Sequence, residues 1–159
     1  MKKTINLGVI GIDHGHIFDM LDEMLKEDCT CSYFWTEGDP LTLKEFNSKY
    51  PNIKRIENKE EILNDPSVDM ILISSVPKDR AYNSIEALKA GKDVMVDKPG
   101  CTTLDQLNQL KQTVKETGKI WSVNFSERFH VAAVAKAEEL VNEGKIGNVK
   151  QTIGTGPHR

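Results

Sequence analysis

The sequence predicts an α/β fold, a doubly wound and mainly parallel sheet of about six strands in a three-layer αβα arrangement. Short apolar or β-branched runs alternate with longer stretches whose apolar residues recur at spacings of three and four, the pattern of successive βαβ units. The run Met70–Ser74 is almost fully apolar, as expected for a central strand buried on both faces. Right-handed crossovers would then place helices on both faces and ligands at the carboxyl ends of the strands.

Six short runs are expected to form the strands. They are Ile5–Ile10, Cys29–Trp35, Lys54–Ile56, Met70–Ser74, Val94–Val96 and Ile120–Asn124. The third run is the weakest, because it holds two cations and one apolar residue. A seventh strand-like run, Val149–Ile153, begins close to the end of the chain.

The first predicted helices lie between these strands and are marked by capping residues. One helical face after the first strand carries Ile17, Met20, Leu21, Met24 and Leu25. Thr42 is expected to cap the helix that carries Leu43 and Phe46. Asn58 with Glu61 resembles a capping box at the start of a short helix.

The later helices end at glycines, which accept a left-handed backbone conformation without steric cost. A helix from about Arg80 to Ala90 is expected to stop at Gly91, and the next to stop at Gly118. Thr103 and Gln106 are expected to cap that second helix. Its predicted core stripe is Leu104, Leu107, Leu110 and Val114, and the last predicted helix is Val131–Asn142.

Composition excludes several classes of partner. The 159 residues include 21 basic and 24 acidic side chains, a net charge of −3, which gives no electrostatic footprint for nucleic acid or an anionic membrane. No apolar run approaches the roughly 20 residues of a membrane span, and no signal peptide is recognisable, so a cytoplasmic location is expected. Three cysteines without paired C-x-x-C spacing indicate plain thiols rather than a zinc site or disulfides.

The loop after the first strand has the position of a dinucleotide-binding fingerprint, in which glycines let backbone amides and a helix dipole meet a pyrophosphate. Gly11 and Ile12 open this loop, but Asp13 stands at the second glycine position and His16 at the third. A carboxylate beside phosphates is repulsive unless it turns away or Gly15 provides the close approach instead. The alternative is a tight turn that binds nothing.

Two further features of the sequence bear on ligands. His14 and His16 form an H-x-H pair beside Asp13. One pair on one turn lacks further ligands, so we expect no metal site and instead assign these side chains to the cofactor loop. Glu37, at the end of the second strand, could accept hydrogen bonds from an adenosine ribose, which favours NAD over NADP. The alternative for Glu37 is an exposed glutamate in a turn.

The stretch from Val68 to Leu110 carries a set of motifs found together. A strand ends in a proline-containing loop with Ser75 and Pro77, an Ala-Gly-Lys helix end follows at residues 90–92, and the next strand leads into Asp97-Lys98-Pro99. This set strongly resembles the glucose–fructose oxidoreductase/inositol dehydrogenase family, Gfo/Idh/MocA, whose N-terminal domain is a Rossmann-type nucleotide-binding fold. Asp97 replaces the glutamate of the family's Glu-Lys-Pro motif.

Two further segments are similar to the family. Arg128-Phe129 resembles its Arg-Phe pair after the sixth strand, and Gly144-Lys-Ile-Gly147 resembles its entry into a second domain. The histidine that the family usually places near Arg80 is missing here.

The resemblance implies hydride transfer between NAD or NADP and a hydroxyl-bearing carbon of a sugar, a cyclitol or a related polyol. It implies that Lys98 is the catalytic residue beside the nicotinamide, because an ammonium there stabilises a developing alkoxide and can exchange a proton. Asp97 would orient Lys98, and Pro99 would fix the backbone that follows. The loop residues Ser75 and Pro77 are assigned to the cofactor site with them.

The resemblance also implies a division of the chain into residues 1–124, the NAD(P)-binding domain, and residues 125–159, a helix with the start of a truncated second domain. In the family that second domain lines the substrate pocket and supports oligomers. We therefore expect the 159 residues to be inactive alone, with a homo-oligomer only where the second domain is present. Two alternatives are a noncatalytic nucleotide-sensing or interaction module of the same family, and a nucleotide-binding domain for another ligand.

Overall fold

A computed structural model describes residues 4–125 and 131–154 of the chain. The chain divides into two compact units, Met1–Asn124 and Phe125–Arg159. The first unit contains the sheet, and the second contains one described helix, α7 (Ala132–Asn142), none of whose residues is buried.

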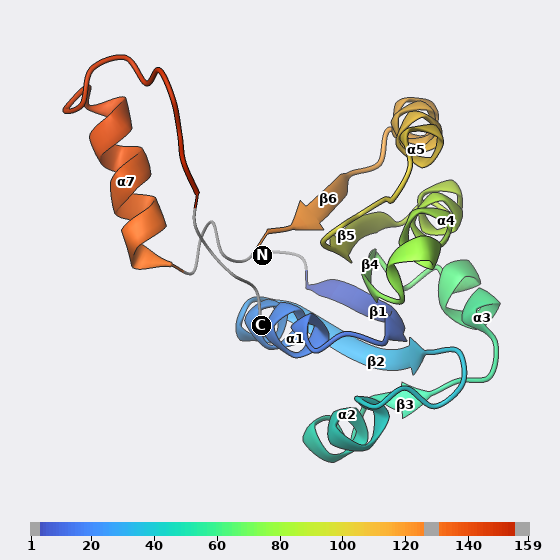
Figure 1. Cartoon of the computed structure of the whole chain (residues 1–159). Helices are drawn as coiled ribbons and strands as arrows, with labels where there is room; N and C mark the ends of the chain where they lie inside the picture. The colour runs from blue at the N-terminus through green and yellow to red at the C-terminus, as the bar shows by residue number, and fades with distance from the viewer. Residues whose placement is uncertain (1–3, 126–130, 155–159) are drawn as a thin grey trace. The chain divides into compact units, whose positions relative to one another are not determined.

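The first unit is built on a six-stranded sheet in the order β3-β2-β1-β4-β5-β6 (Figure 1). The strands are β1 (Ile5–Ile12), β2 (Cys29–Trp35), β3 (Lys54–Arg55), β4 (Met70–Ser74), β5 (Asp93–Asp97) and β6 (Trp121–Asn124). Every neighbouring pair is parallel. This confirms the predicted Rossmann-type α/β fold, in which the chain reverses its direction of growth between β1 and β4.

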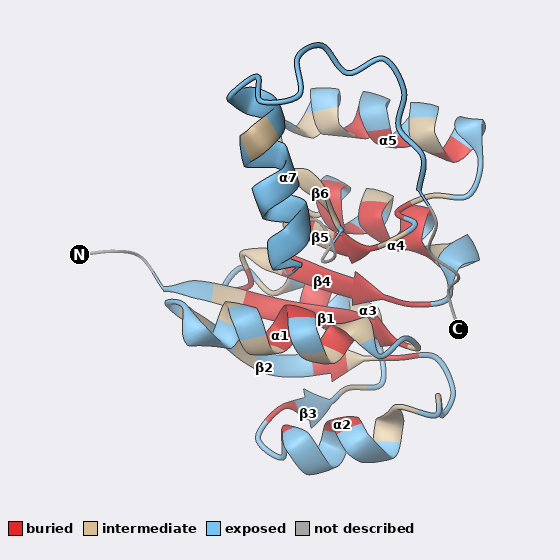
Figure 2. Cartoon of the chain, turned by 60° about the vertical axis from the view of Figure 1, so that its left-hand side comes forward, coloured by how far each residue is buried: buried red, intermediate tan, exposed pale blue. Residues whose placement is uncertain are grey.

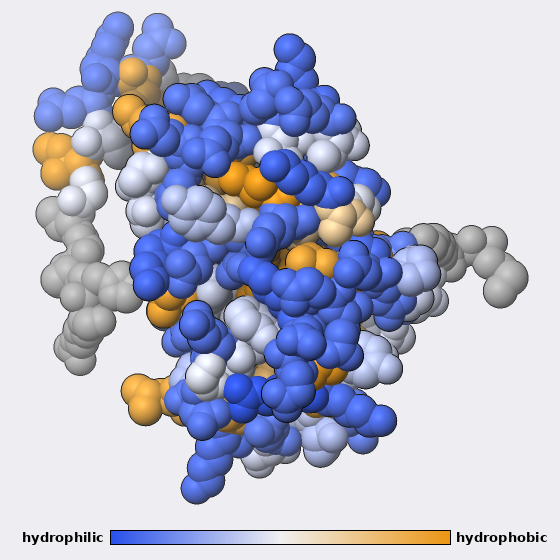
Figure 3. All heavy atoms as spheres, turned by 90° about the vertical axis from the view of Figure 1, so that its right-hand side faces the viewer, coloured by the Kyte–Doolittle hydropathy of each residue, from blue (hydrophilic) through white to orange (hydrophobic). Residues whose placement is uncertain are grey.

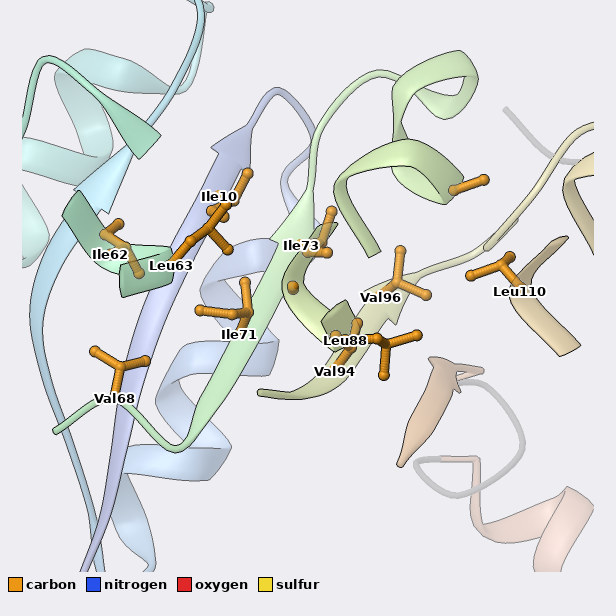
Figure 4. Close-up of a cluster of buried hydrophobic side chains, with 12 residues drawn as sticks. Ile10, Ile62, Leu63, Val68, Ile71, Ile73, Leu88, Val94, Val96 and Leu110 are labelled. Carbon is orange, nitrogen blue, oxygen red and sulfur yellow. The ribbon is translucent and has the colours of Figure 1, made fainter. Parts of the chain in front are cut away.

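The sheet has an apolar cluster on each face, because successive side chains of a strand point to opposite sides. Ile71 and Ile73 of β4 pack against α3, α4 and α5, together with Ile10, Val94 and Val96 (Figure 4). Leu72 of the same strand joins the opposite cluster, with Val9 and residues of α1 and α2. The central strands β1, β4 and β5 are therefore mostly buried, while the helices keep exposed outer faces (Figure 2).

The helices of the first unit begin and end close to the predicted positions. They are α1 (His16–Lys26), α2 (Leu43–Lys49), α3 (Lys59–Asn64), α4 (Pro77–Lys89) and α5 (Leu104–Thr117). The predicted cap of α5 is confirmed, since the Thr103 hydroxyl accepts a hydrogen bond from the Gln106 N–H at 3.1 Å. Gly118 follows with a left-handed φ of 67°.

Several details of the helix prediction were wrong. The helix α4 begins at Pro77 rather than near Arg80, because proline fits the first helical position, where its missing N–H is not needed. The side chains of Thr42 and Asn58 make no capping hydrogen bond; the Thr42 hydroxyl donates to the Ile12 carbonyl instead. Leu104 and Leu25 are 77% and 37% exposed, because each lies near a helix end, where less of the sheet covers it.

The predicted strand Val149–Ile153 was also wrong. Residues 149–153 form no strand and are exposed. A strand needs neighbours to pair with, and no other strand lies within the described part of the second unit. The Arg128-Phe129 pair lies outside the described residues.

The face shown in Figure 3 is mostly hydrophilic, with apolar side chains in small separate groups. Scattered apolar residues of this kind are normal on a protein surface. Among the described helices, none is long and apolar enough to cross a membrane.

Candidate functional site: a crevice at the strand ends

A cleft of about 590 Å³ lies at the carboxyl ends of β1, β2 and β4, beside the start of α4. Its lining includes four of the predicted cofactor residues, Gly11, Asp13, Glu37 and Ser75. The cleft lies where the strand order reverses, which is where open α/β sheets bind ligands. The lining is polar and carries four acidic side chains, Asp13, Glu37, Asp79 and Glu86, against two lysines, Lys59 and Lys78.

Gly11 is held against the loop that follows β4. Its φ is 76°, a left-handed conformation that side chains rarely adopt. A Cβ built on Gly11 would lie 2.5 Å from the Ser75 Cβ and 2.7 Å from the Ser75 nitrogen. Gly11 and Ile12 were predicted to open the loop, but both lie in β1, and only glycine lets this strand end approach the loop after β4 so closely. The neighbouring Ile12 is completely buried and can offer a ligand only its backbone.

We expect Gly11→Ala to lower the free energy of unfolding by at least about 2 kcal/mol, because it combines a strained φ with a backbone clash. Gly15→Ala is the matched control in the same loop. Gly15 has a φ of −62°, and a Cβ there would meet nothing within 4 Å. Urea unfolding should therefore show Gly15→Ala close to wild type. Equal losses in both variants would contradict the role given to Gly11.

Asp13 is partly buried and lies in the fingerprint loop, directly after the end of β1. Burial raises the pKa of its carboxyl group; a backbone hydrogen bond lowers that pKa, while Asp79 and Glu37 raise it and Arg80 lowers it. The carboxylate is thus held in a cleft of mainly negative charge. Glu37 is exposed at the end of β2, in the same cleft.

The remaining loop residues gather around Asp97, the last residue of β5. Asp97 is completely buried. Nδ1 of His16 lies 2.8 Å from its Oδ1, and Nδ1 of His14 lies 3.1 Å from its Oδ2. Burial lowers the pKa of His14, and the Asp97 charge opposes that shift. The fingerprint loop is therefore tied to the end of β5, across 81 residues of sequence.

Arg80 of α4 completes this cluster. Its side chain is 2% exposed, and Nη2 lies 2.9 Å from Asp97 Oδ2. Nε donates to the Ser75 carbonyl at 2.7 Å, and Nη1 donates to the Lys98 carbonyl. One guanidinium thus joins the loops after β4 and β5, at the turn where the Lys98–Pro99 peptide bond is cis.

Lys98 is half-buried, and Pro99 beside it is exposed. Neither residue lines the cleft, nor does Pro77, which begins α4 with its side chain exposed. Most of the predicted site residues thus fall into two groups, one lining the cleft around Gly11 and one around the buried Asp97, while Pro77 belongs to neither.

Sequence reasoning missed several residues of the cleft and the cluster. Asn83 donates to the Ser75 hydroxyl at 3.2 Å, and Lys59 pairs with Glu86 at 2.5 Å. For Arg80, the sequence analysis gave the start of a helix and the absence of the family's histidine, but no partner for its charge. A signal was available, because Arg80 shares a helical face with Ala81, Ser84, Ala87 and Leu88, and an arginine on a buried face needs an acid partner.

The model of an oxidoreductase family with an NAD-binding Rossmann fold, Gfo/Idh/MocA, matches residues 5–125. The chain belongs to this family. The match spans β1 to β6 and therefore includes both groups of site residues, which makes the fingerprint loop and the Asp97-Lys98-Pro99 turn parts of one nucleotide-binding domain.

Several relatives are named as dehydrogenases. The chain is 27% identical over 146 residues to 1-carboxy-3-chloro-3,4-dihydroxycyclohexa-1,5-diene dehydrogenase of Comamonas testosteroni, covering 92% of this chain and 36% of that protein. It is 34% identical over 91 residues to the NAD⁺-dependent scyllo-inositol 2-dehydrogenase of Bacillus subtilis, covering 57% of this chain and 26% of that one.

A solved structure of an oxidoreductase from Erwinia carotovora atroseptica SCRI1043 superimposes with a TM-score of 0.85 at 34% identity. The match covers 90% of this chain and 43% of that protein. The chain thus spans less than half the length of these Gfo/Idh/MocA relatives.

Proposed function

We propose that this Gfo/Idh/MocA chain binds a nicotinamide dinucleotide across the cleft and supplies Lys98 to a dehydrogenase that acts on a hydroxyl-bearing carbon of a sugar- or cyclitol-like substrate. When bound, the nicotinamide would accept or deliver the hydride. The observation that carries the proposal is the Arg80 guanidinium, which fixes the loop after β4 and the Lys98 turn in one arrangement.

The residues of the cleft fit one end of a dinucleotide. Gly11 brings the backbone of the fingerprint loop against Ser75, so a ligand can approach main-chain amides at the start of α1. Glu37 follows β2, where a carboxylate can accept hydrogen bonds from both ribose hydroxyls of NAD and repels the 2′-phosphate of NADP. Relatives are named for either cofactor, since two scyllo-inositol 2-dehydrogenases of Bacillus subtilis are named for NADP⁺ and NAD⁺ respectively.

At the other end, Lys98 would carry the proton chemistry. An ammonium next to the substrate hydroxyl lowers the cost of the alkoxide that forms as hydride leaves, and its neutral form can accept the hydroxyl proton. Asp97, wholly buried, and Arg80 hold the backbone of this turn, so the Lys98 side chain starts from a fixed point. Such preorganisation is what hydride transfer requires of the protein.

The proposal is tested by titrating the purified chain with NAD⁺ and NADP⁺. We expect dissociation constants for NAD⁺ of tens of micromolar or weaker, about −6.5 kcal/mol at most, because four carboxylates line the cleft with only two lysines. NADP⁺ should bind more weakly still. Calorimetry measures both values.

Variants of Asp13 identify the cause of the weak binding. Asp13→Gly should tighten NAD⁺ binding about tenfold, and Asp13→Asn should give part of that gain by removing the charge alone. Glu45→Gln, an exposed carboxylate outside this cleft, is the control for net charge. Submicromolar binding by the wild-type chain, or an equal gain from Glu45→Gln, would refute the inhibitory role of Asp13. No binding of either dinucleotide in any variant would refute the proposed function.

A further inference from the structure

The cluster of His14, His16 and Asp97 has the composition of a metal site. The sequence alone predicts no metal site at the two histidines, because their loop offers no third ligand. The fold supplies a third ligand by bringing Asp97 to them from the end of β5. One potential ligand atom from each residue lies within 4.8 Å of the other two. Two imidazoles and one carboxylate on one side of an ion are a donor set used by Zn²⁺, Co²⁺ and Fe²⁺, with the remaining positions open.

One carboxylate oxygen of Asp97, Oδ2, lies in a buried ion pair with Arg80 but has no well-aligned hydrogen bond. Oδ2 is buried and accepts no aligned hydrogen bond from the described residues, although Arg80 Nη2 lies 2.9 Å and His14 Nδ1 lies 3.1 Å away. A carboxylate oxygen can accept more than one partner, so an ion could bind to Asp97 while the Arg80 pair is kept. The two histidines approach from the partly exposed side, and their side chains are 48% and 22% exposed, which leaves a path for an ion.

The distances suit coordination after a small adjustment. Nitrogen and oxygen ligands lie about 2.0–2.2 Å from zinc, so those of a tetrahedral site are roughly 3.4 Å apart. The nitrogen-to-oxygen distances here are 2.8 and 3.1 Å, so coordination requires them to open by a few tenths of an ångström, and both histidine rings are partly exposed. Arg80 would remain as the outer partner that orients the carboxylate, as hydrogen-bond donors to ligating carboxylates commonly do.

We propose that His14, His16 and Asp97 bind one divalent transition-metal ion through both Nδ1 atoms and the carboxylate, with Zn²⁺ and Co²⁺ as ions of the fitting class. The positive charges of Arg80 and Lys98 nearby reduce the affinity, so the site is expected to bind in the micromolar range. This inference does not depend on dinucleotide binding. A bound ion would rigidly link the fingerprint loop to the Lys98 turn.

The test uses the 159-residue chain and the metal salts alone, without dinucleotide. Calorimetry with ZnCl₂ should show one ion per chain, and CoCl₂ should give the visible absorption of a low-symmetry Co²⁺ site. His16→Gln and His14→Gln should each weaken binding at least about tenfold while leaving the fold intact, because neither histidine is fully buried. Circular dichroism checks the fold.

Two controls complete the experiment. Cys29 and Cys31 are thiols outside this cluster, so the double variant Cys29→Ser/Cys31→Ser should bind Zn²⁺ as the wild type does. Asp97→Asn should lose binding as well, but the histidine variants decide the result if that variant fails to fold. No binding to the wild type, or binding that both histidine variants retain, would overturn the proposal.

Discussion

Replacing Lys98 by alanine is expected to slow hydride transfer about 10²-fold, a loss of roughly 3 kcal/mol of transition-state stabilisation. The ammonium is proposed to act only where charge develops, so the affinity for the dinucleotide should change little. The measurement is single-turnover hydride transfer at saturating cofactor, in a preparation of the protein that is active on its substrate.

Two comparisons separate catalysis from structure. Lys98→Arg should not restore the rate, because guanidinium keeps the charge but does not exchange its proton near neutral pH. Thermal unfolding of Lys98→Ala should differ from wild type by only about 0.5 kcal/mol, since the side chain is half-buried and no described contact of Nζ is broken. A variant that keeps more than about a third of the wild-type rate would show that Lys98 is not catalytic, and would favour a noncatalytic nucleotide-sensing role.

Replacing Arg80 by methionine is expected to produce the largest loss of stability, about 3 to 5 kcal/mol in the free energy of unfolding. The reason is that Asp97 stays completely buried while its arginine partner, itself 1% exposed, is removed. The carbonyls of Ser75 and Lys98 lose their donor in the same change. Chemical denaturation of wild type and variant measures this difference.

The matched control is Arg55→Met. The Arg55–Asp39 pair has the same separation of 2.9 Å as Arg80–Asp97, but both of its side chains are exposed. Solvent screening limits such pairs to about 1 kcal/mol or less. If Arg55→Met costs as much as Arg80→Met, the buried cluster has no special role. Arg80→Lys should recover only part of the loss, because one ammonium cannot serve three acceptors in a fixed fork.

Local sequence signals were sufficient for the sheet and most helix ends. Met70–Ser74 and Cys29–Trp35 were predicted with their observed bounds, because each is a short run bounded by polar or turn residues, the first almost wholly apolar and the second rich in aromatic residues. Gly118 and Thr103 marked helix ends through backbone and side-chain bonds to near neighbours in sequence. The helix prediction failed where the hydrogen-bond partner is distant in sequence. Thr42 is an example, because its hydroxyl donates to the Ile12 carbonyl instead of capping its own helix.

The candidate site shows the same division. The sequence by itself determined the family motifs, which single out Gly11, Asp97 and Lys98 as candidate site residues. The end of the second predicted strand singles out Glu37. Only the tertiary structure decided that His14 and His16 face Asp97, and that Arg80 lies between Asp97 and the Lys98 carbonyl. Parallel strands bring their carboxyl ends to one edge regardless of distance along the chain, and a buried charge selects its partners by proximity in space, which no spacing in sequence records.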